Sequence, residues 1–330
     1  MNAFAVYALF AAGIILLIRF GDIFVDSSSY FARATGIPEF VVGATVVSFG
    51  TTLPEMIVSS MAAYDARKLA QAGIYEKAID KIGMSVGNGI GSVTANTALI
   101  LALSMVFMPV KISDKAFRKK AFILISGVVV LWFVTAFTGE LRIWGSAALT
   151  VIFVVFMAEN IISSKNTRDT VEDIPEKDGR TFAVNIIKLI AGAVGIMTGS
   201  HLLVEYGSRI AFSLGVPESV VGITAVAVGT SLPELVTTLN AVIKKQPTLS
   251  AGNIIGANII DTALILPVSS FIYSGSLPVS RQNIALDFPL CILATLIAVV
   301  PVIIKKRFFR IQGILLLAVY SIYIAAVCVT

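Results

Sequence analysis

Ten long apolar runs divide this chain and determine the solvent in which it can fold. They lie near residues 3–20, 36–63, 83–110, 120–137, 143–163, 183–204, 213–243, 250–273, 283–304 and 311–329. A helix of about 20 apolar residues is long enough to cross a hydrocarbon layer roughly 30 Å thick. Only 14% of the residues are charged, which is too few to cover a water-soluble protein of this size. We therefore predict an all-α, multi-pass membrane protein with ten transmembrane helices.

Lysine and arginine residues gather in alternate loops between these runs. One set of loops holds sixteen of them, concentrated near residues 111–120, 165–180 and 305–310, whereas the other set holds seven. Because loops rich in Lys and Arg stay on the cytoplasmic side, we expect both termini to be extracellular and the protein to lie in the plasma membrane. The same distribution accounts for the net charge of +5, so no nucleic-acid partner is expected.

An internal repeat relates the two halves of the chain. Residues 36–60 return 179 positions later, and a second pair of segments, 87–101 and 252–266, is identical at nine of fifteen positions. The second pair is offset by only 165 positions, so the first half carries fourteen extra residues, which we assign to an external loop or short surface helix near 64–81. The predicted units are a first five-helix repeat at 1–162 with motif segments 43–60 and 87–101, a short cytoplasmic linker at 163–182, and a second five-helix repeat at 183–330 with motif segments 222–239 and 252–266.

Each repeat is predicted to contain five helices, which is an odd number. The second copy then enters the membrane from the side opposite to the first, so we predict that the two repeats are inverted. Inverted repeats related by an axis in the membrane plane are typical of secondary transporters, and their substrate site lies near the midplane where the copies meet.

Residues that weaken a helix interrupt four of the runs at matching places. Pro54 and Pro233 lack the N–H group that would bond the carbonyl four residues earlier, so they should free carbonyls near Gly50 and Gly229. Freed carbonyls inside a bilayer must be satisfied by protein, water or an ion. We therefore expect broken helices at the midplane. The other two breaks are predicted at Gly87–Gly91 and Gly252–Gly256.

Side chains that carry oxygen surround these predicted breaks. They are Ser48, Thr51, Thr52 and Glu55 in the first half, Thr230, Ser231 and Glu234 in the second half, and Asn96 and Asp261 at matching positions of the second motif pair. Ca²⁺ takes about six to eight oxygen ligands, and an acidic group at mid-span usually marks a pathway because it is costly there. The pattern therefore predicts a cation site around Glu55 and Glu234.

Each of these groups also has a purely structural interpretation. The two glutamates could form a polar pair across a helix interface, and the hydroxyl groups could bond to carbonyls of their own helices. Asn88 and Asn253 are interpreted as caps of the broken helices rather than as ligands.

The paired motifs carry a resemblance to a known family. They read GTTLPE at 50–55 and GTSLPE at 229–234, then GNGIGS at 87–92 and GNIIGA at 252–257. With these motifs the chain resembles the prokaryotic sodium/calcium exchangers of the cation/calcium antiporter superfamily, over nearly its whole length. The resemblance implies Ca²⁺ and Na⁺ as transported ions and no cofactor. It also implies that the first and sixth spans slide across the core to alternate access.

The resemblance implies specific ligands as well. Glu55 and Glu234 would be the central calcium ligands, assisted by the main-chain carbonyls of Thr51 and Thr230. One sodium site would comprise Ser48, Thr51, Thr52, Glu55 and Ser92, and its mirror would comprise Ala227, Thr230, Ser231 and Glu234, with Asn96 and Asp261 flanking the centre. This sequence departs from the family at Ala257, where serine is usual, so the occupancy of one sodium site and the coupling ratio stay open.

The predicted function is antiport, in which Na⁺ and Ca²⁺ compete for the same oxygens and the protein carries one kind of load at a time. Exchange of Ca²⁺ or another divalent cation for H⁺ on the same scaffold is the open alternative, although hydroxyls beside both glutamates favour Na⁺. We do not expect an enzyme, because the chain has neither a G-x-G-D nor an H-E-x-x-H motif. The lipid bilayer is the expected partner and a monomer the expected functional unit.

Overall fold

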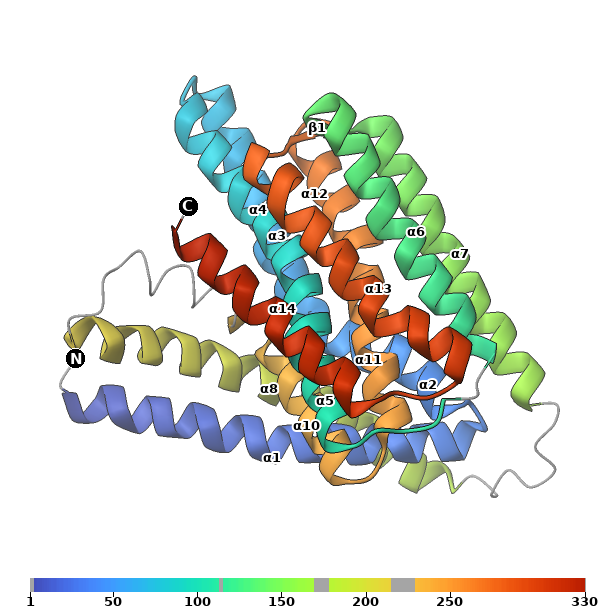
Figure 1. Ribbon diagram of the computed structural model, residues 1–330. Coiled ribbons are helices and arrows are strands. Elements are labelled where there is room, and N and C mark those ends of the chain that lie inside the picture. Colours follow the sequence, from blue (N-terminus) through green and yellow to red (C-terminus); the bar gives the residue numbers. More distant parts are fainter. Residues whose placement is uncertain (1–2, 113–114, 169–177, 215–228, 330) are drawn as a thin grey trace.

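The computed structural model is almost entirely helical (Figure 1). It describes residues 3–112, 115–168, 178–214 and 229–329. Within these residues, eight helical stretches are long and apolar enough to cross a membrane. They are Phe4–Thr35, Glu39–Gln71, Tyr75–Phe107, Ala116–Thr138, Ile143–Lys165, Gly179–Ser213, Pro247–Tyr273 and Asn283–Lys305, with shorter apolar helices at Leu232–Ile243 and Arg310–Ala326. The prediction of an all-helical, multi-pass membrane protein is confirmed, whereas the count of ten spans remains a prediction.

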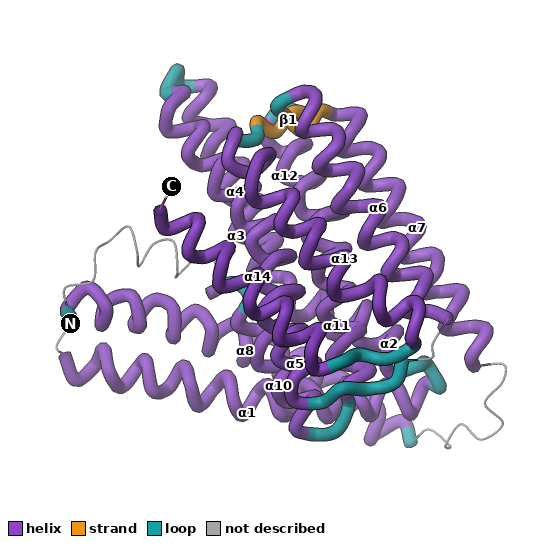
Figure 2. The backbone as a smooth tube through the Cα atoms, in the orientation of Figure 1, coloured by secondary structure: helices purple, strands orange, loops and turns teal. Residues whose placement is uncertain are grey.

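The first half consists of long helices joined by short connections (Figure 2). The turn between α3 and α4 uses Gly73, whose left-handed φ of 78° favours glycine. The stretch that we expected to form a loop or short surface helix instead extends α3 and α4 beyond the bundle. In chain order the elements are α1 (Ala3–Thr35), α2 (Glu39–Val42), the π-helical η1 (Gly43–Val47), α3 (Ser48–Gln71), α4 (Tyr75–Ala95), the π-helical η2 (Asn96–Leu101), α5 (Ala102–Phe107), α6 (Lys115–Thr138), β1 (Glu140–Arg142) and α7 (Ile143–Arg168).

The second half begins with α8, whose N-terminus is capped by Asp178. The Asp178 carboxylate accepts hydrogen bonds from the backbone N–H groups of Arg180 and Thr181, a common way to start a helix. Residues 169–177 of the predicted linker lie outside the described residues. The elements of this half are α8 (Gly179–Ser213), α10 (Leu232–Ile243), α11 (Pro247–Ile260), the π-helical η3 (Asp261–Ile265), α12 (Leu266–Tyr273), β2 (Ser276–Pro278), the π-helical η4 (Asn283–Asp287), α13 (Phe288–Lys305) and α14 (Arg310–Val329).

Burial separates an inner group of helices from an outer one. The most apolar part of Pro247–Tyr273 is 83% buried, but that of Gly179–Ser213 is only 22% buried. The outer helices expose apolar side chains, such as Ile187 on α8 and Val154 on α7. These exposed faces would be unfavourable in water, and they suit the acyl chains of a bilayer. The motif residues lie on the inner helices, away from lipid.

Helices α1 and α8 lie side by side and cross the other helices obliquely (Figure 1). Glycines bring their backbones close together. A Cβ atom on Gly199 would lie 2.9 Å from the carbonyl oxygen of Gly13, and one on Gly13 would lie 3.0 Å from that of Gly199. Small residues are the usual means by which membrane helices approach this closely. The two long helices therefore form a tightly packed pair.

Short antiparallel pairings join loops of the two halves at both ends of α13. Before α13, β1 pairs with β2, with Leu141 opposite Leu277. After α13, the N–H group of Phe308 donates to the carbonyl of Val110, and the N–H group of Ile112 donates to the carbonyl of Lys306. Each pairing thus connects a loop of the first half with a loop of the second half.

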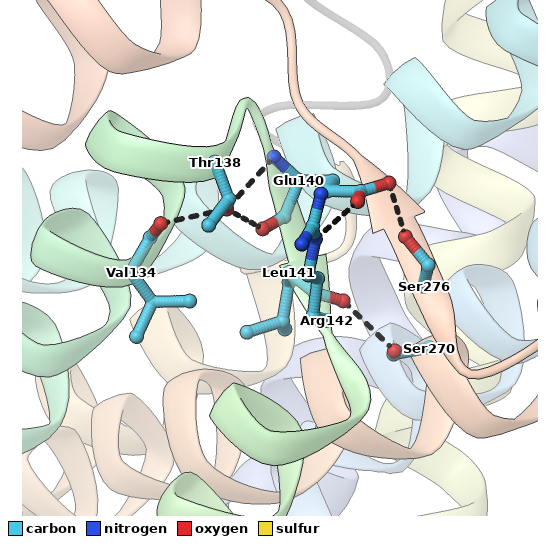
Figure 3. Close-up of polar contacts among 7 residues, drawn as sticks. All are labelled: Val134, Thr138, Glu140, Leu141, Arg142, Ser270 and Ser276. Atoms are coloured by element: carbon cyan, nitrogen blue, oxygen red, sulfur yellow. Dashed lines mark hydrogen bonds and ion pairs between the residues drawn. The ribbon is translucent and has the colours of Figure 1, made fainter.

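Side chains reinforce the β1–β2 pairing (Figure 3). The Ser276 hydroxyl donates to the Glu140 carboxylate at 2.5 Å, and the Nε atom of Arg142 lies 2.5 Å from the same carboxylate. These two neighbours, Ser276 first, hold the pKa of Glu140 below its ordinary value. Ser270 in α12 donates to the carbonyl of Leu141 at 3.1 Å. The connection between α6 and α7 is therefore fixed to the second half.

The predicted proline breaks occur in one half only. Helix α3 runs continuously through Pro54, and the π-helical η1 lies just before it. In the second half, Thr230 and Ser231 form a turn, and α10 begins at Leu232. A proline can remain inside a membrane helix when neighbouring groups satisfy the freed backbone. The prediction is therefore met before Pro233 and is wrong at Pro54.

The breaks predicted at the glycine segments are also wrong. Helices α4 and α11 continue through Gly87–Gly91 and Gly252–Gly256. The backbone irregularity lies farther along each helix, where η2 begins at Asn96 and η3 begins at Asp261. π-Helical turns displace the regular hydrogen bonds and are frequent at functional sites. Here both turns begin at the central polar residue of the second motif pair.

Candidate ion-binding site

Two buried glutamates from separate elements lie next to each other inside the protein, and a buried aspartate interacts with both at longer range. Glu55 lies in α3, Glu234 lies in the first turn of α10, and Asp261 begins η3, and all three are 0% exposed. The carboxylate of Glu55 interacts electrostatically with those of Glu234 and Asp261. The hydroxyl of Thr52, which precedes Glu55 by nearly one turn, donates to Oε1 of Glu234 at 3.2 Å. The two glutamates predicted from the sequence therefore lie in one region.

Most of the acidic oxygens have no hydrogen-bond partner among the described residues. Both carboxylate oxygens of Glu55, both of Asp261, and Oε2 of Glu234 are buried and accept no hydrogen bond from a hydroxyl, amide or backbone N–H group of the described residues, and the carboxyl groups of Glu55 and Glu234 contact each other. The side-chain amide of Asn96 is also buried, and neither its oxygen nor its nitrogen has a partner there. Buried polar groups are nearly always hydrogen-bonded, because an unsatisfied one costs about 1–3 kcal/mol and a charged one costs more. A cation bound among these oxygens would remove that cost.

Two asparagine–threonine hydrogen bonds link the halves beside the acidic groups. The Thr51 hydroxyl in α3 donates to Oδ1 of Asn253 in α11 at 3.2 Å. The Thr230 hydroxyl donates to Oδ1 of Asn88 in α4 at 3.0 Å. Asn88 also donates to the carbonyl of Glu55 at 3.2 Å. The interpretation of both asparagines as helix caps is therefore wrong: they lie inside α4 and α11 and hold motif threonines of the opposite half.

The backbone carbonyl of Ser48 accepts hydrogen bonds from the two threonine hydroxyl groups of the first motif. Thr52 donates to it at 2.6 Å, and Thr51 lies at 3.4 Å from it. The Ser48 hydroxyl itself bonds to the carbonyl of Thr45 at 3.1 Å. Bonding of this kind to a residue's own helix was the structural interpretation considered from the sequence. Both threonines nevertheless also reach a partner in the other half, so their hydroxyl oxygens lie at the interface between the halves.

Of the remaining residues of the two predicted sodium sites, two serines contact each other and one position lacks a side-chain oxygen. Ser92 in α4 and Ser231 before α10 are both buried, and their hydroxyl oxygens lie 3.4 Å apart. The resemblance assigned these two serines to different sodium sites, but they contact each other here. Ala257 is buried in α11 and contributes no side-chain oxygen. Ala227 lies outside the described residues.

The glycine of each proline motif is covered by one of the two long helices. A Cβ atom on Gly50 would lie 2.8 Å from the ring of Phe24 in α1. A Cβ atom on Gly229 would lie 2.5 Å from the side chain of Val204 in α8. Glycine at these positions leaves room for α1 and α8 to pack directly over the segments that carry the predicted ligands.

The chemistry of this donor set suits a hard cation. Among the described residues, no three acidic, histidine or cysteine side chains are grouped as a ready-made metal centre. The available donors are a few carboxylate oxygens together with hydroxyl, amide and main-chain oxygens. Ca²⁺ and Na⁺ bind oxygen in flexible geometry, whereas transition metals favour nitrogen and sulfur ligands.

Comparison with known proteins covers nearly the whole chain. A family model described as sodium/calcium exchanger protein matches residues 5–161 and 184–329. An uncharacterized membrane protein of Methanocaldococcus jannaschii is 33% identical, over 96% of both chains. Sodium/calcium exchanger MaX1 of Methanosarcina acetivorans is 27% identical over 96% of this chain and 97% of its own. The solved structure of the sodium-calcium exchanger NCX_Mj soaked with 10 mM Na⁺ and zero Ca²⁺ has a TM-score of 0.83 and 29% identity, covering 98% of this chain and 99% of that one. This chain therefore belongs to the sodium/calcium exchanger family.

Proposed function

We propose that this protein exchanges Na⁺ for Ca²⁺ across the membrane by alternating access. The observation that carries this proposal is the group of buried carboxylate oxygens of Glu55, Glu234 and Asp261 that lack hydrogen-bond partners among the described residues. Uncompensated charge is costly inside a membrane protein, and such groups usually mark an ion pathway. Two relatives named sodium/calcium exchangers, one of them studied with Na⁺ and Ca²⁺ in its crystals, support the choice of ions.

Glu55 and Glu234 are the proposed central calcium ligands. The carbonyls of Thr51 and Thr230 would complete the calcium site. Sodium would use overlapping oxygens, and Asn96 and Asp261 would flank the centre. The proposed sodium ligands are Ser48, Thr51, Thr52, Glu55 and Ser92 on one side and Ala227, Thr230, Ser231 and Glu234 on the other.

Shared ligands explain how transport of the two ions is coupled. An ion of either kind that occupies the glutamates excludes the other, so the protein carries one load at a time. Movement with bare carboxylates is unfavourable, because their charges would cross the low-dielectric interior unpaired. Empty transitions are therefore rare, and the flux of one ion drives the counterflux of the other.

An inverted arrangement of the two repeats would provide access from both sides. Two sets of contacts support it. The Thr51–Asn253 and Thr230–Asn88 hydrogen bonds join equivalent sequence positions with the halves exchanged. The loop pairings are exchanged in the same way. The loop between α6 and α7 pairs with the loop between α12 and α13. The loop between α5 and α6 pairs with the loop between α13 and α14. We propose that α1 and α8, which cover Gly50 and Gly229, move to open one side at a time.

The orientation in the membrane follows from the charge distribution. We propose that the lysine-rich ends of the helices, including the α10–α11 turn, face the cytoplasm and that both termini are extracellular. The protein would then act at the plasma membrane, and the direction of net Ca²⁺ movement would follow the Na⁺ gradient.

Transport in proteoliposomes tests the proposal. With Na⁺ inside and none outside, at equal buffered pH, the purified protein should accumulate ⁴⁵Ca²⁺, and an ionophore that collapses the Na⁺ gradient should abolish uptake. Glu234→Gln should lose this uptake, whereas Glu205→Gln, an exposed acidic residue on α8, should keep it. Ca²⁺ uptake driven by a pH gradient in the absence of Na⁺ would instead identify a proton-coupled exchanger and refute the proposal.

A further inference from the structure

An ion cluster fastens α1 to the turn between α10 and α11. The ammonium group of Lys244 lies 2.5 Å from a carboxylate oxygen of Asp22 and 2.6 Å from one of Asp26. It also donates to the backbone carbonyl of Asp22 at 3.2 Å. The Lys244 side chain is 20% exposed, whereas those of Asp22 and Asp26 are 56% and 64% exposed, so solvent screens the cluster from the side of α1. One cation thus bridges two acids that are one helical turn apart on α1.

The turn that carries Lys244 is short and hydrogen-bonded to both α10 and α1. It contains only three residues between α10 and α11, and Lys245 adopts a left-handed φ of 58°. Gln246 bonds back to the carbonyl of Ala241 at 2.7 Å. Ser29 of α1 donates to the side-chain oxygen of Gln246 at 2.5 Å, which gives a second connection between α1 and this turn. The backbone of the turn therefore fixes the position of Lys244, and the side chain of Lys244 binds α1.

The same cluster is coupled to the candidate ion site through two elements. Helix α10 begins with Glu234 in its first turn and ends directly before Lys244. On α1, the two aspartates flank Phe24, which packs against Gly50 of the first proline motif. Displacement of α1 away from the α10–α11 turn would therefore uncover the segment that carries Glu55.

The mirror-related positions, in α8 and the α3–α4 connection, form no such cluster among the described residues. At the offset of 179 residues, Asp22 corresponds to His201, Asp26 to Glu205 and Lys244 to Asp65, so the position equivalent to the lysine is acidic. Glu205 instead pairs with Arg209 of its own helix at 2.5 Å. Among the described residues, no ion pair joins α8 to the α3–α4 connection. Of the ion pairs between described residues, only those of Lys244 join one half of the chain to the other.

We propose that Lys244 is a positioning residue that, through Asp22 and Asp26, holds α1 over the ion site and sets the balance between the two access states. This inference rests on the proposed alternating access. With the cluster intact, the end of the protein at the α10–α11 turn stays closed. Loss of the cluster shifts the population toward the state that is open at that end, so ions bind better from that side and worse from the other.

The test compares apparent Ca²⁺ affinities on the two sides of the membrane. Na⁺-dependent Ca²⁺ transport is measured in right-side-out and inside-out vesicles from cells expressing the full chain. Lys244→Met should change the ratio of the two apparent KM values by up to about fivefold, the upper end for an ion cluster whose aspartates are 56% and 64% exposed. Lys244→Arg should keep the wild-type ratio, and so should Lys245→Met, which alters the exposed neighbouring lysine.

The double variant Asp22→Asn, Asp26→Asn provides an independent check if Lys244→Met does not fold. It should reproduce the same shift in ratio, because it removes the other side of the cluster. An unchanged KM ratio in both variants, with normal wild-type flux, would overturn the role of Lys244 and leave the proposed function standing. If the wild-type protein shows no Na⁺-dependent Ca²⁺ flux, the proposed function fails first, and the role of Lys244 in alternation fails with it.

Discussion

Replacement of Glu55 by glutamine separates an ion ligand from a structural polar group. The substitution keeps the size of the side chain and removes one negative charge from a fully buried position. For a charge at an effective dielectric constant near 20, a unit partner at 4 Å contributes about 4 kcal/mol, and a divalent ion contributes more. Removal of one partner from a buried charged cluster typically costs about 3–5 kcal/mol. Glu55→Gln should therefore weaken Ca²⁺ binding by about 100-fold or more.

The same substitution should have the opposite effect on the protein without ions. Neither oxygen of Glu55 accepts a hydrogen bond from the described residues, and its electrostatic neighbours include the carboxylates of Glu234 and Asp261. Neutralising Glu55 removes this repulsion and an unsatisfied charge. The ion-free variant should unfold at a temperature equal to or higher than that of the wild type.

Thermal unfolding in detergent, with and without Ca²⁺, measures both effects. At a Ca²⁺ concentration about 100 times the wild-type Kd, binding stabilises the wild type by about 2.7 kcal/mol. A variant that binds about 100-fold more weakly gains only about 0.4 kcal/mol at that concentration. Glu205→Gln should match the wild type in both conditions. A Glu55→Gln protein that melts below the wild type without ions, yet gains the full stabilisation from Ca²⁺, would refute the assignment of Glu55 as a ligand.

Three further outcomes are expected from other parts of the molecule. Ala257→Ser should lower the Na⁺ concentration needed for half-maximal transport, because it adds a buried hydroxyl to the second half; unchanged Na⁺ dependence would argue against a sodium ligand there. Asn253→Ala should reduce stability by about 1 kcal/mol, because the Thr51 hydroxyl loses its partner in the other half, and thermal unfolding measures this. In the β1–β2 pairing, Glu140 has a lowered pKa, so its stabilising contribution is present above the ordinary carboxyl pKa of about 4.3 and is lost as the pH falls through the lower folded value. The difference in unfolding temperature between Glu140→Gln and wild type should therefore be larger at pH 6 than near pH 3, and a difference that does not change with pH would contradict this explanation.

The general plan of the molecule could be predicted from the sequence because the bilayer imposes a simple rule. Every span must be apolar along about 20 residues, so the runs that contain Glu55 and Glu234 were identifiable, and their acidic groups stood out against an apolar background. The internal repeat places these two glutamates at equivalent positions of the two halves. The structure places both of them, fully buried, near one another and near Asp261.

Local backbone geometry was harder to predict, because tertiary packing overrides the local signals. Pro54 and Pro233 occupy equivalent motifs, yet α3 continues through Pro54 and only the second half has a turn before its proline. The π-helical segments at Asn96 and Asp261 have no sequence signature of their own. Glycine suggested a break at Gly252–Gly256, but its role there is close packing, since a Cβ atom at Gly256 would contact the backbone of Ala44.

Contacts between distant segments could not be predicted from a single sequence. The bond between Thr51 and Asn253 joins residues about 200 positions apart, and local patterns do not report such pairs. The cluster of Lys244 with Asp22 and Asp26 could not be predicted for the same reason, because it joins residues more than 200 positions apart. The offset of 179 residues between the repeats does show that the first half has Asp65 at the position equivalent to Lys244.

Equilibrium Ca²⁺ binding to the purified protein at increasing Na⁺ concentration tests the central claim most directly. If both ions use the oxygens of Glu55 and Glu234, the apparent Kd for Ca²⁺ should rise steeply with Na⁺, and saturating Na⁺ should displace all bound Ca²⁺. An apparent Kd that stays constant while Na⁺ rises, at fixed pH and ionic strength, would show that the two ions occupy separate sites and would contradict coupling by exclusion.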